Sequence, residues 1–401
     1  MRRCIVRLTS VLAIAVLNAS CGDAVVDPEL NVALVSVAAG IQHTCGLTAN
    51  GQAFCWGWNE HGQLGNGADE DRSVPVAVQG GLTFESLAGG GGHTCGVATD
   101  GRGYCWGFNL SGQLGDGTTT SRNTPTPVSG DLTFTSLSAG GSLTCGLATD
   151  GSAHCWGWNG EGQLGNGDTD DRSSPTPVSG GLTVSEISVG NFHVCAVSTA
   201  NELYCWGRNE TGQIGDGTVL GSSIPIATGS GMAFESVSVG SGHTCGISLS
   251  EAYCWGYAEY GQTGNGGANK DVPTLLNGTI QFAVLYAGGN YTCGLTGAGE
   301  AHCWGINNLG QHGSLSTQIC SVLDETGQII DQFACAFEPA LVETQVRFSS
   351  LSLGQHHSCG ISTDNLAYCW GGGLTGELGD GRSGNTYTRV ALELVSGQPG
   401  A

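Results

Sequence analysis

Positive charge is scarce in this sequence. Its 401 residues contain 12 Lys plus Arg against 34 Asp plus Glu, and Lys270 is the only lysine. Because binding to a phosphate backbone needs clustered basic side chains, a formal charge of −22 argues against a nucleic-acid partner. Charged residues make up only 11% of the chain, which excludes a highly charged disordered segment.

Proline and long apolar runs are also scarce, whereas glycine is abundant. The chain has 10 Pro and 70 Gly, and the glycines follow no three-residue period, which excludes collagen. Glycine at this frequency favours short strands joined by tight turns over long helices. The sequence therefore predicts an all-β fold.

Residues 1–20 predict a secretory signal peptide, because three arginines precede an apolar run at 8–17 that is too short to span a bilayer. Cys21 then resembles the lipidated cysteine of a bacterial lipobox, although Asn18 stands where such boxes usually have leucine. The alternative is ordinary cleavage with Cys21 free or in a disulfide. Either way we expect an exported protein, secreted or held in the cell envelope as a periplasmic or outer-surface lipoprotein, with residues 21–31 as a tether.

The tripeptide Cys-Trp-Gly recurs seven times, and a second cysteine precedes each copy by nine or ten residues. The resulting cysteine pairs are Cys45 with Cys55, Cys95 with Cys105, Cys145 with Cys155, Cys195 with Cys205, Cys245 with Cys254, Cys293 with Cys303, and Cys359 with Cys369. Units repeat about every 50 residues, which is the signature of a repeat architecture. The last interval is longer because the sixth unit has an insertion.

Residues 132–180 show the plan of one unit, with strands at 132–139, 144–148 and 152–156 and a fourth around Pro177. A three-residue turn with glycine in its left-handed position joins the second and third strands. Counting outward from this turn places the two cysteines of each unit opposite each other, at disulfide distance. Cys320 and Cys335 remain inside the insertion and predict an eighth bridge, and an exported protein is where such bridges persist.

A histidine precedes the first cysteine by two residues in five units, and on a strand the two share a face, so a zinc site is one alternative. These histidines are His43, His93, His193, His243 and His357. Leu143 and Tyr291 take their place in units that keep both cysteines. We therefore expect structural histidines bonded to neighbouring backbone, and neither a metal nor a cofactor.

Four-stranded units that cannot bury their faces alone indicate a ring of blades. The string GxxHTCGLxxDGxxxCWGxNxxGQLGxG, as in Gly90–Gly117, resembles the regulator of chromosome condensation repeat family. The resemblance covers residues 32–396 and implies a seven-bladed β-propeller of four-stranded antiparallel blades, followed by a tail at 397–401. The paired cysteines depart from intracellular members and fit an exported branch. We expect the tryptophan of each Cys-Trp-Gly to pack against the next blade.

Alternating strand directions place the loops that leave the first and third strands of every unit on one rim. The insertion at 314–337 lies on the same rim. We predict a binding surface there, formed by Trp58, Phe108, Trp158, Arg208, Tyr257, Phe192, Tyr291 and His356. The alternative is that these side chains cap the blade ends.

The function predicted is non-catalytic recognition of a protein or other macromolecule through this rim, with the membrane contacted only through a lipid anchor. Family members serve as GTPase exchange factors or, when secreted, as β-lactamase inhibitors, but no residue match carries either activity over. One alternative is an enzyme with its site in the central funnel. Another is a carbohydrate-binding module that uses Trp58 and Trp158. Acidic loops at 69–71 and 168–171 have ligand chemistry for Ca²⁺, but the second unit has Thr118–Thr120 there, so we expect solvated loops.

Overall fold

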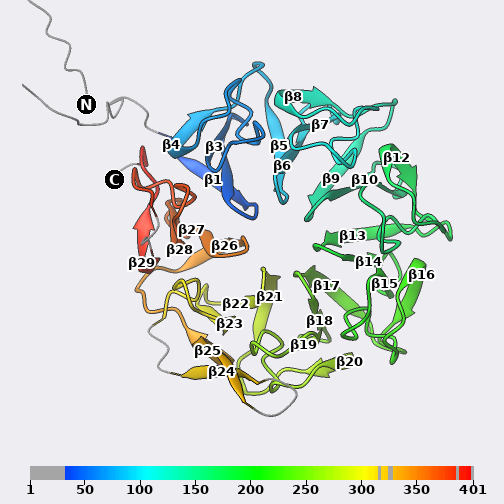
Figure 1. The fold of residues 1–401 in the computed structure, drawn as a ribbon, viewed down its shortest axis with the longest axis vertical. Coiled ribbons are helices and arrows are strands. Elements are labelled where there is room, and N and C mark those ends of the chain that lie inside the picture. The colour runs from blue at the N-terminus through cyan, green and yellow to red at the C-terminus, as the bar shows by residue number, and fades with distance from the viewer. Residues whose placement is uncertain (1–31, 315–317, 324–327, 385–387, 399–401) are drawn as a thin grey trace, which may run out of the picture.

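The computed structural model is a ring of seven radial sheets around a central axis (Figure 1), which confirms the predicted fold class. It describes residues 32–314, 318–323, 328–384 and 388–398. The predicted signal peptide and Cys21 lie outside these residues.

Each sheet is one blade, and in every blade except the sixth the strands follow one another outward from the axis in chain order. The first three blades contain β1 (Leu34–Ala39), β2 (His43–Thr48), β3 (Ala53–Gly57) and β4 (Arg72–Ala77); β5 (Phe84–Gly89), β6 (His93–Ala98), β7 (Gly103–Gly107) and β8 (Arg122–Pro127); and β9 (Phe134–Ala139), β10 (Leu143–Ala148), β11 (Ala153–Gly157) and β12 (Arg172–Pro177). Blades four and five contain β13 (Val184–Val189), β14 (His193–Ser198), β15 (Leu203–Gly207) and β16 (Ser222–Thr228); and β17 (Phe234–Val239), β18 (His243–Ser248), β19 (Glu251–Gly256) and β20 (Lys270–Leu275).

The insertion turns blade six into a five-stranded sheet. This blade contains β21 (Phe282–Ala287), β22 (Tyr291–Thr296), β23 (Ala301–Ile306), β24 (Ile319–Leu323) and the long β25 (Ile329–Leu341), in the order β21-β22-β23-β25-β24. Blade seven contains β26 (Phe348–Leu353), β27 (His357–Ser362), β28 (Ala367–Gly372) and β29 (Thr388–Leu394).

The cysteines of each blade lie directly opposite each other on its second and third strands. Cys45 pairs with Cys55 in the β2–β3 register, with the two Cα atoms 4.0 Å apart, and the other six blades repeat this geometry. Cys320 is bonded to Cys335 in the insertion. All eight predicted pairs are therefore present, and none of their cysteines is left as a thiolate for zinc.

The turn beside each disulfide takes the predicted form where glycine is available. Gly51 has φ +78°, the left-handed value that a glycine adopts without strain. The fifth unit is one residue shorter at this point, and Leu249 and Ser250 both take positive φ there. Two consecutive positive φ values make a two-residue hairpin turn, so the shorter loop still closes the hairpin.

One backbone carbonyl joins each pair of neighbouring blades. The carbonyl of Gln63 in blade one accepts the indole N–H of Trp106 at 2.9 Å and the hydroxyl of Thr94 at 2.8 Å, both from blade two. The tryptophan bond recurs at every junction, with Glu377 supplying the carbonyl between blades seven and one. Each tryptophan is fully buried, and a carbonyl bonded to two donors satisfies both of its lone pairs.

The tryptophans pack in the direction opposite to the one predicted. Trp106 lies in a cluster with Cys45 and Cys55 of the preceding blade, and the other six do the same. The sequence showed that cysteine and tryptophan occupy opposite faces of a sheet, but not which neighbour each face meets.

The repeated histidines form a second link between blades. His43 Nε2 lies 2.8 Å from the hydroxyl of Thr94 in the next blade. Because this hydroxyl donates to Gln63, it accepts the N–H of a neutral imidazole. The predicted backbone partner is wrong, since the partner is a side chain of another unit. The same pairing joins His93 to Thr144, His193 to Thr244, His243 to Thr292, and His357 to Thr44.

In the two units without the histidine, the partner residue in the next unit is also changed. Leu143 in blade three is followed by Val194, which stands where the other pairings have threonine, so an apolar pair replaces a polar one. In blade six the hydroxyl of Tyr291 donates to the carbonyl of His357 at 2.6 Å and lies 2.9 Å from the hydroxyl of Ser358. A residue in one unit is therefore paired with the residue one position later in the next unit.

The ring closes between blade seven and blade one without a shared blade, because each takes all its strands from its own unit. Val32 N–H donates to the carbonyl of Gly397 at 2.7 Å, and the amide of Gln398 donates back to the Val32 carbonyl. His357 and Glu377 make the usual contacts to Thr44 and Trp56. Closure therefore uses the tryptophan bond found at every other junction and the histidine–threonine bond found at four of them, together with residues just after β29.

The buried histidines predict a loss of stability in acid. Burial lowers the pKa of His43 to about 4 and that of His93, His193, His243 and His357 to about 3. The unfolded chain then binds more protons than the folded chain below pH 6.5, so the free energy of unfolding should fall as pH drops from 6.5 to about 3. Burial raises the pKa of Glu186 to about 7 and also raises that of Glu377, and these two groups act in the opposite direction against the five histidines.

Urea denaturation at several pH values measures this effect. The variant His93→Gln should show a smaller loss between pH 6.5 and 4 than the natural chain. A free energy of unfolding that stays constant across this interval would contradict neutral buried histidines.

The Leu143–Val194 junction predicts a coupled pair. Leu143→His alone places an imidazole against Val194 with no acceptor for its N–H, which should cost roughly 1–3 kcal/mol. Adding Val194→Thr rebuilds the bond found at five other junctions and should recover most of this loss. A double-mutant cycle measured by thermal unfolding checks the coupling, and simple additivity of the two changes would contradict it.

Candidate binding face

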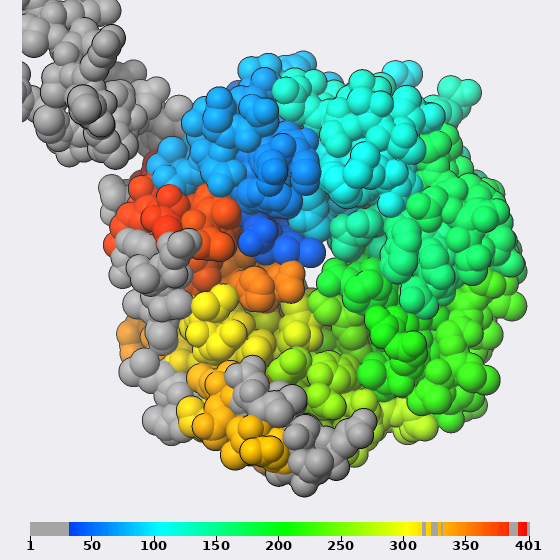
Figure 2. Space-filling model, viewed as in Figure 1, coloured from blue at the N-terminus to red at the C-terminus, as the bar shows by residue number. Residues whose placement is uncertain are grey.

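The loops that leave the first and third strands of a blade lie together on one face of the ring. Trp58 N–H donates to the Gln42 carbonyl at 2.9 Å, and the equivalent bond joins Phe108 to Gly92, Trp158 to Ser142, Arg208 to Phe192 and Tyr257 to Gly242. We call this surface the loop face. Figure 2 shows the ring in space-filling form, with a small opening on its axis.

A buried asparagine folds each long loop of the first four blades. Asn59 Oδ1 accepts the N–H of Leu64 at 3.0 Å, and its Nδ2 donates to the carbonyls of Ala68 and Glu70 at 3.0 and 3.1 Å. Asn109, Asn159 and Asn209 repeat this pattern. This role was not predicted from the sequence, although asparagine stands three residues after the Cys-Trp-Gly tryptophan in five of the seven units.

Carboxylates in the acidic loops also accept hydrogen bonds that hold these loops in shape. Asp71 and Asp171 accept the N–H of Asn59 and Asn159 at 2.8 Å, and Arg172 pairs with Asp168. These acids therefore help to fold the loops. Among the residues that the structure describes, no three His, Cys, Asp or Glu side chains are grouped to hold a metal ion.

Three groups of aromatic side chains lie on the loop face, each at a junction between blades. The Trp58 cluster joins blades one and two, with His61 5.1 Å from Trp58 and 4.6 Å from Phe108 between ring centroids. All three side chains are half-buried. They leave part of each ring accessible at a fixed place, which suits contact with a partner.

The Trp158 cluster joins blades three and four. Trp158 meets Phe192 edge-on at 6.0 Å, and the guanidinium of Arg208 lies 5.4 Å above the Phe192 ring. Glu210 pairs with Arg208 from the other side. A cation–π contact and an ion pair thus fix the arginine in place.

The Tyr260 cluster joins blade five to the insertion. Tyr260 lies 5.5 Å from Tyr257 and 5.0 Å from Phe333 of β25, in edge-on contacts. Burial and a bond to Glu259 raise the pKa of Tyr257, so its hydroxyl stays protonated. Tyr260 and Phe333 were missed by the sequence analysis because no other unit repeats them.

Exposed aliphatic side chains add to this surface. Leu110, Leu220 and Leu374, at the third-strand loops of blades two, four and seven, are 70%, 74% and 45% exposed. Their positions vary between units, so the repeat pattern did not select them.

Two of the residues predicted for the rim, Tyr291 and His356, differ in how far they are buried. Tyr291 is fully buried and bonded to Ser358, so its assignment to the binding surface is wrong. Its place beside the variable loop residue suggested exposure, but its side chain replaces the buried histidine of the other blades. His356 is half-buried in the corresponding loop of blade seven, and burial lowers its pKa.

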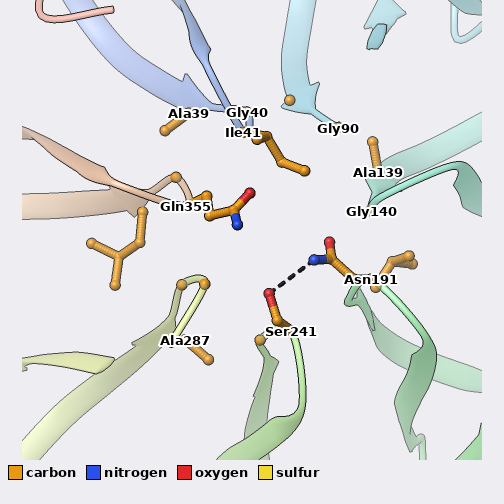
Figure 3. Close-up of a pocket in the computed structure, with 17 residues that line it drawn as sticks. Ala39, Gly40, Ile41, Gly90, Ala139, Gly140, Asn191, Ser241, Ala287 and Gln355 are labelled. Carbon is orange, nitrogen blue, oxygen red and sulfur yellow. Dashed lines mark hydrogen bonds between the residues drawn. The ribbon is translucent and has the colours of Figure 1, made fainter. Parts of the chain in front are cut away.

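A hollow on the axis opens among the first loops (Figure 3). Gly40 and its counterparts surround it, and Ile41, Gln355, Asn191 and Ser241 point toward its centre, with Asn191 Nδ2 donating to Ser241 Oγ at 2.8 Å. Its volume is about 70 Å³. No charged side chain and no histidine line it, so it lacks the acid–base groups that the central-funnel enzyme requires.

Glycine is required around this hollow because neighbouring blades touch there. A Cβ on Gly140 would lie 1.9 Å from the carbonyl oxygen of Gly190 in the next blade. Larger residues would force the blades apart. The ring of glycines thus keeps the axis narrow at the loop face.

Asn59 provides a test of how the loop face is held. Asn59→Asp keeps the shape of the side chain but removes the two Nδ2 bonds and faces two carbonyls with a carboxylate. We expect a loss of about 1–3 kcal/mol in the free energy of unfolding and faster amide exchange across residues 58–71. Asn50→Asp, in an exposed turn between β2 and β3, is the matched control. Equal effects from the two changes would contradict the role of Asn59.

No helix in the described part of the chain is long and apolar enough to span a bilayer.

Comparisons with known proteins agree with this architecture. Human E3 ubiquitin-protein ligase HERC2 is 45% identical over 47 residues, which is 12% of this chain and 1% of that protein, so the two share only a short segment. The structure of Prp20p from Saccharomyces cerevisiae, reported with its binding to Gsp1p and histones, has a TM-score of 0.74 at 20% identity over 92% of this chain and 88% of that one. Human WBSCR16 has a TM-score of 0.71 at 20% identity over 84% and 88%. These likenesses show the shared fold.

Family models described as the regulator of chromosome condensation (RCC1) repeat match more than half of the chain. One matches residues 50–97, 100–147, 150–197 and 201–247, and a second matches 34–63, 134–163 and 184–213. With seven blades built on this repeat, the chain belongs to the RCC1 repeat family.

Proposed function

We propose that this chain is an exported binding protein that recognises another protein or large ligand through its loop face. The observation that carries the proposal is the presence of three accessible aromatic clusters on that face, at the junctions of blades one and two, three and four, and five and six. Aromatic and arginine side chains held by their neighbours are typical of binding hot spots.

The spacing of the clusters indicates a large partner. They occupy alternate junctions around the ring, and Leu110, Leu220 and Leu374 expose further apolar surface on blades two, four and seven of the same face. The axial hollow has a volume of only about 70 Å³. A macromolecule can cover several clusters at once, whereas a small molecule would reach only one.

Export is supported by the sulfur chemistry of the chain. Seven blades each carry a buried disulfide, and such bonds persist in oxidising compartments rather than in the cytosol. The signal-like residues 1–20 and the lipobox-like Cys21 agree with this location. We propose that lipid on Cys21 holds the protein in the cell envelope and provides its only membrane contact.

The fold relationship is compatible with binding. Prp20p, which shares this architecture, binds Gsp1p and histones. Those ligands are not transferred, because identity at 20% relates the folds alone.

Capture from native envelope extract tests the proposal. The lipid-free protein with Trp58→Ala and Trp158→Ala should retain its melting temperature and lose at least about tenfold in binding, since hot-spot residues contribute at least about 2 kcal/mol each. Ile280→Ala, in a loop that leaves the fourth strand on the opposite face, is the matched control and should bind normally.

Two results would reject the proposal. One is that the natural chain captures no macromolecule, and the other is that the double variant binds as well as the control. Glycan-array binding that the two tryptophan changes abolish would instead establish the carbohydrate-binding alternative.

A further inference from the structure

In six of the seven blades, the strand that pairs with the third strand carries a proline at the same place, and in five of these blades that strand is the open outer edge of the sheet. A proline immediately precedes the residue that lies opposite the second cysteine of the blade. These prolines are Pro75, Pro125, Pro175, Pro225, Pro273 and Pro339.

The register shows what the proline does. Val78 N–H donates inward to the carbonyl of Ala53, and Val76 lies opposite Cys55. Because directions alternate along a strand, position 75 faces away from the sheet. Proline there removes an outward N–H and blocks the addition of another strand.

The insertion places an additional strand outside this protection. β24 lies beyond β25 at the end of the blade-six sheet, and no other strand in the described ranges pairs with its far side. Its residues Ile319–Leu323 include neither proline nor charge. In Figure 1 it lies at the periphery of the ring.

The directions of the β24 amides follow from one bond. Cys335 N–H donates to the Gln318 carbonyl at 3.2 Å, so positions 318, 320 and 322 face β25. Positions 319, 321 and 323 consequently direct their N–H and C=O groups to the open side. Ile319 is 59% exposed and Ser321 is exposed, so this edge is accessible.

The hairpin that β24 forms with β25 is also held in place on its inner face. Cys320 is bonded to Cys335, and Phe333 packs against Tyr260 of blade five. Phe337 lies against Gly261, where an added Cβ would be 2.9 Å from its ring. An edge that is already ordered does not lose that conformational entropy on binding.

β29 is the other outer strand without the proline, since Leu392 stands in its place. It carries Glu393, and a charged side chain on an edge strand opposes the addition of another strand. β24 has neither form of protection.

We propose that β24 binds an extended segment of a positively charged partner protein by strand addition. Charge complementarity selects this occupant, because a formal charge of −22 attracts a basic segment and repels a second copy of this chain. Backbone bonds to positions 319, 321 and 323 provide affinity, and apolar side chains of the segment pack beside Ile319. The inference goes beyond the proposed function and shares with it only the premise of a protein partner.

A matched pair of variants at Ser321 tests the proposal. Ser321→Pro removes one outward N–H and leaves the backbone bonds to β25 in place. Ser321→Ala keeps that N–H, and both variants lose the side-chain bond from Gln332 to the Ser321 hydroxyl. The probe is a short synthetic peptide of alternating valine and lysine, with binding followed by fluorescence anisotropy. We expect Ser321→Ala to bind like the natural chain and Ser321→Pro to bind about tenfold or more weakly, with unchanged melting temperatures.

Amide exchange provides the second measurement. Peptide binding should slow exchange at Ile319 and Ser321 in the natural chain, and a peptide with glutamate in place of lysine should not bind. Equal peptide affinity of the two Ser321 variants, or no binding to the natural chain, would overturn the proposal. A concentration-dependent dimer that Ser321→Pro abolishes would overturn it in favour of a second copy as the occupant.

The two proposals, strand addition to β24 and binding through the loop face, can fail independently. Peptide affinity should be unchanged in the Trp58→Ala, Trp158→Ala variant. Envelope capture that depends on the two tryptophans but not on Ser321 would leave the loop-face function intact and reject strand addition.

Discussion

The structure depends on one carbonyl oxygen at each junction between blades. At the first junction the Gln63 carbonyl accepts both the Trp106 indole and the Thr94 hydroxyl, in a region fully removed from water. An unpaired donor there would cost more than a typical hydrogen bond contributes, so each buried donor needs this carbonyl. Where Val194 replaces the threonine, the Gln163 carbonyl still accepts the indole N–H of Trp206. The loop that supplies this carbonyl also displays Trp58 and His61. The same short segment therefore joins two blades and positions side chains on the loop face. A change that weakens the junction should also displace those side chains.

The period of the sequence was sufficient to predict the ring, the strand order and the disulfides, because these depend on distances within one unit. Counting from the turn beside Asp100 places Cys95 opposite Cys105 without knowledge of any other blade. Contacts between units were not accessible in this way. The threonine partner of His43 is 51 residues away, and the direction of tryptophan packing depends on how neighbouring sheets stack. Tyr291 was misplaced for the same reason, since its buried partner lies in the following unit.

One such contact did leave a trace in the sequence. Leu143 occupies the position of the histidine in the third unit, and Val194 occupies the position of the threonine in the fourth unit. Comparing each unit with the following one, rather than aligning all units to a common pattern, would have shown that the two positions change together. His61 and Phe333 left no comparable trace, because each occurs once and its neighbours come from different blades. Residues that distinguish one unit from another are the hardest to interpret from a repeat, and they also carry whatever specificity the protein has.

The insertion shows how a repeat fold can acquire a further surface without disturbing its junctions. β25 keeps Pro339 and the usual register with β23, so blade six still ends as the other blades do. The added β24 lies beyond β25, to which it is bonded, and Phe333 of β25 packs on Tyr260. Selection for stability acts on the protected edges, because an open edge on a folded monomer invites aggregation. An unprotected edge that is nevertheless ordered by a disulfide is difficult to explain as part of the scaffold, and strand pairing with a basic partner accounts for both properties.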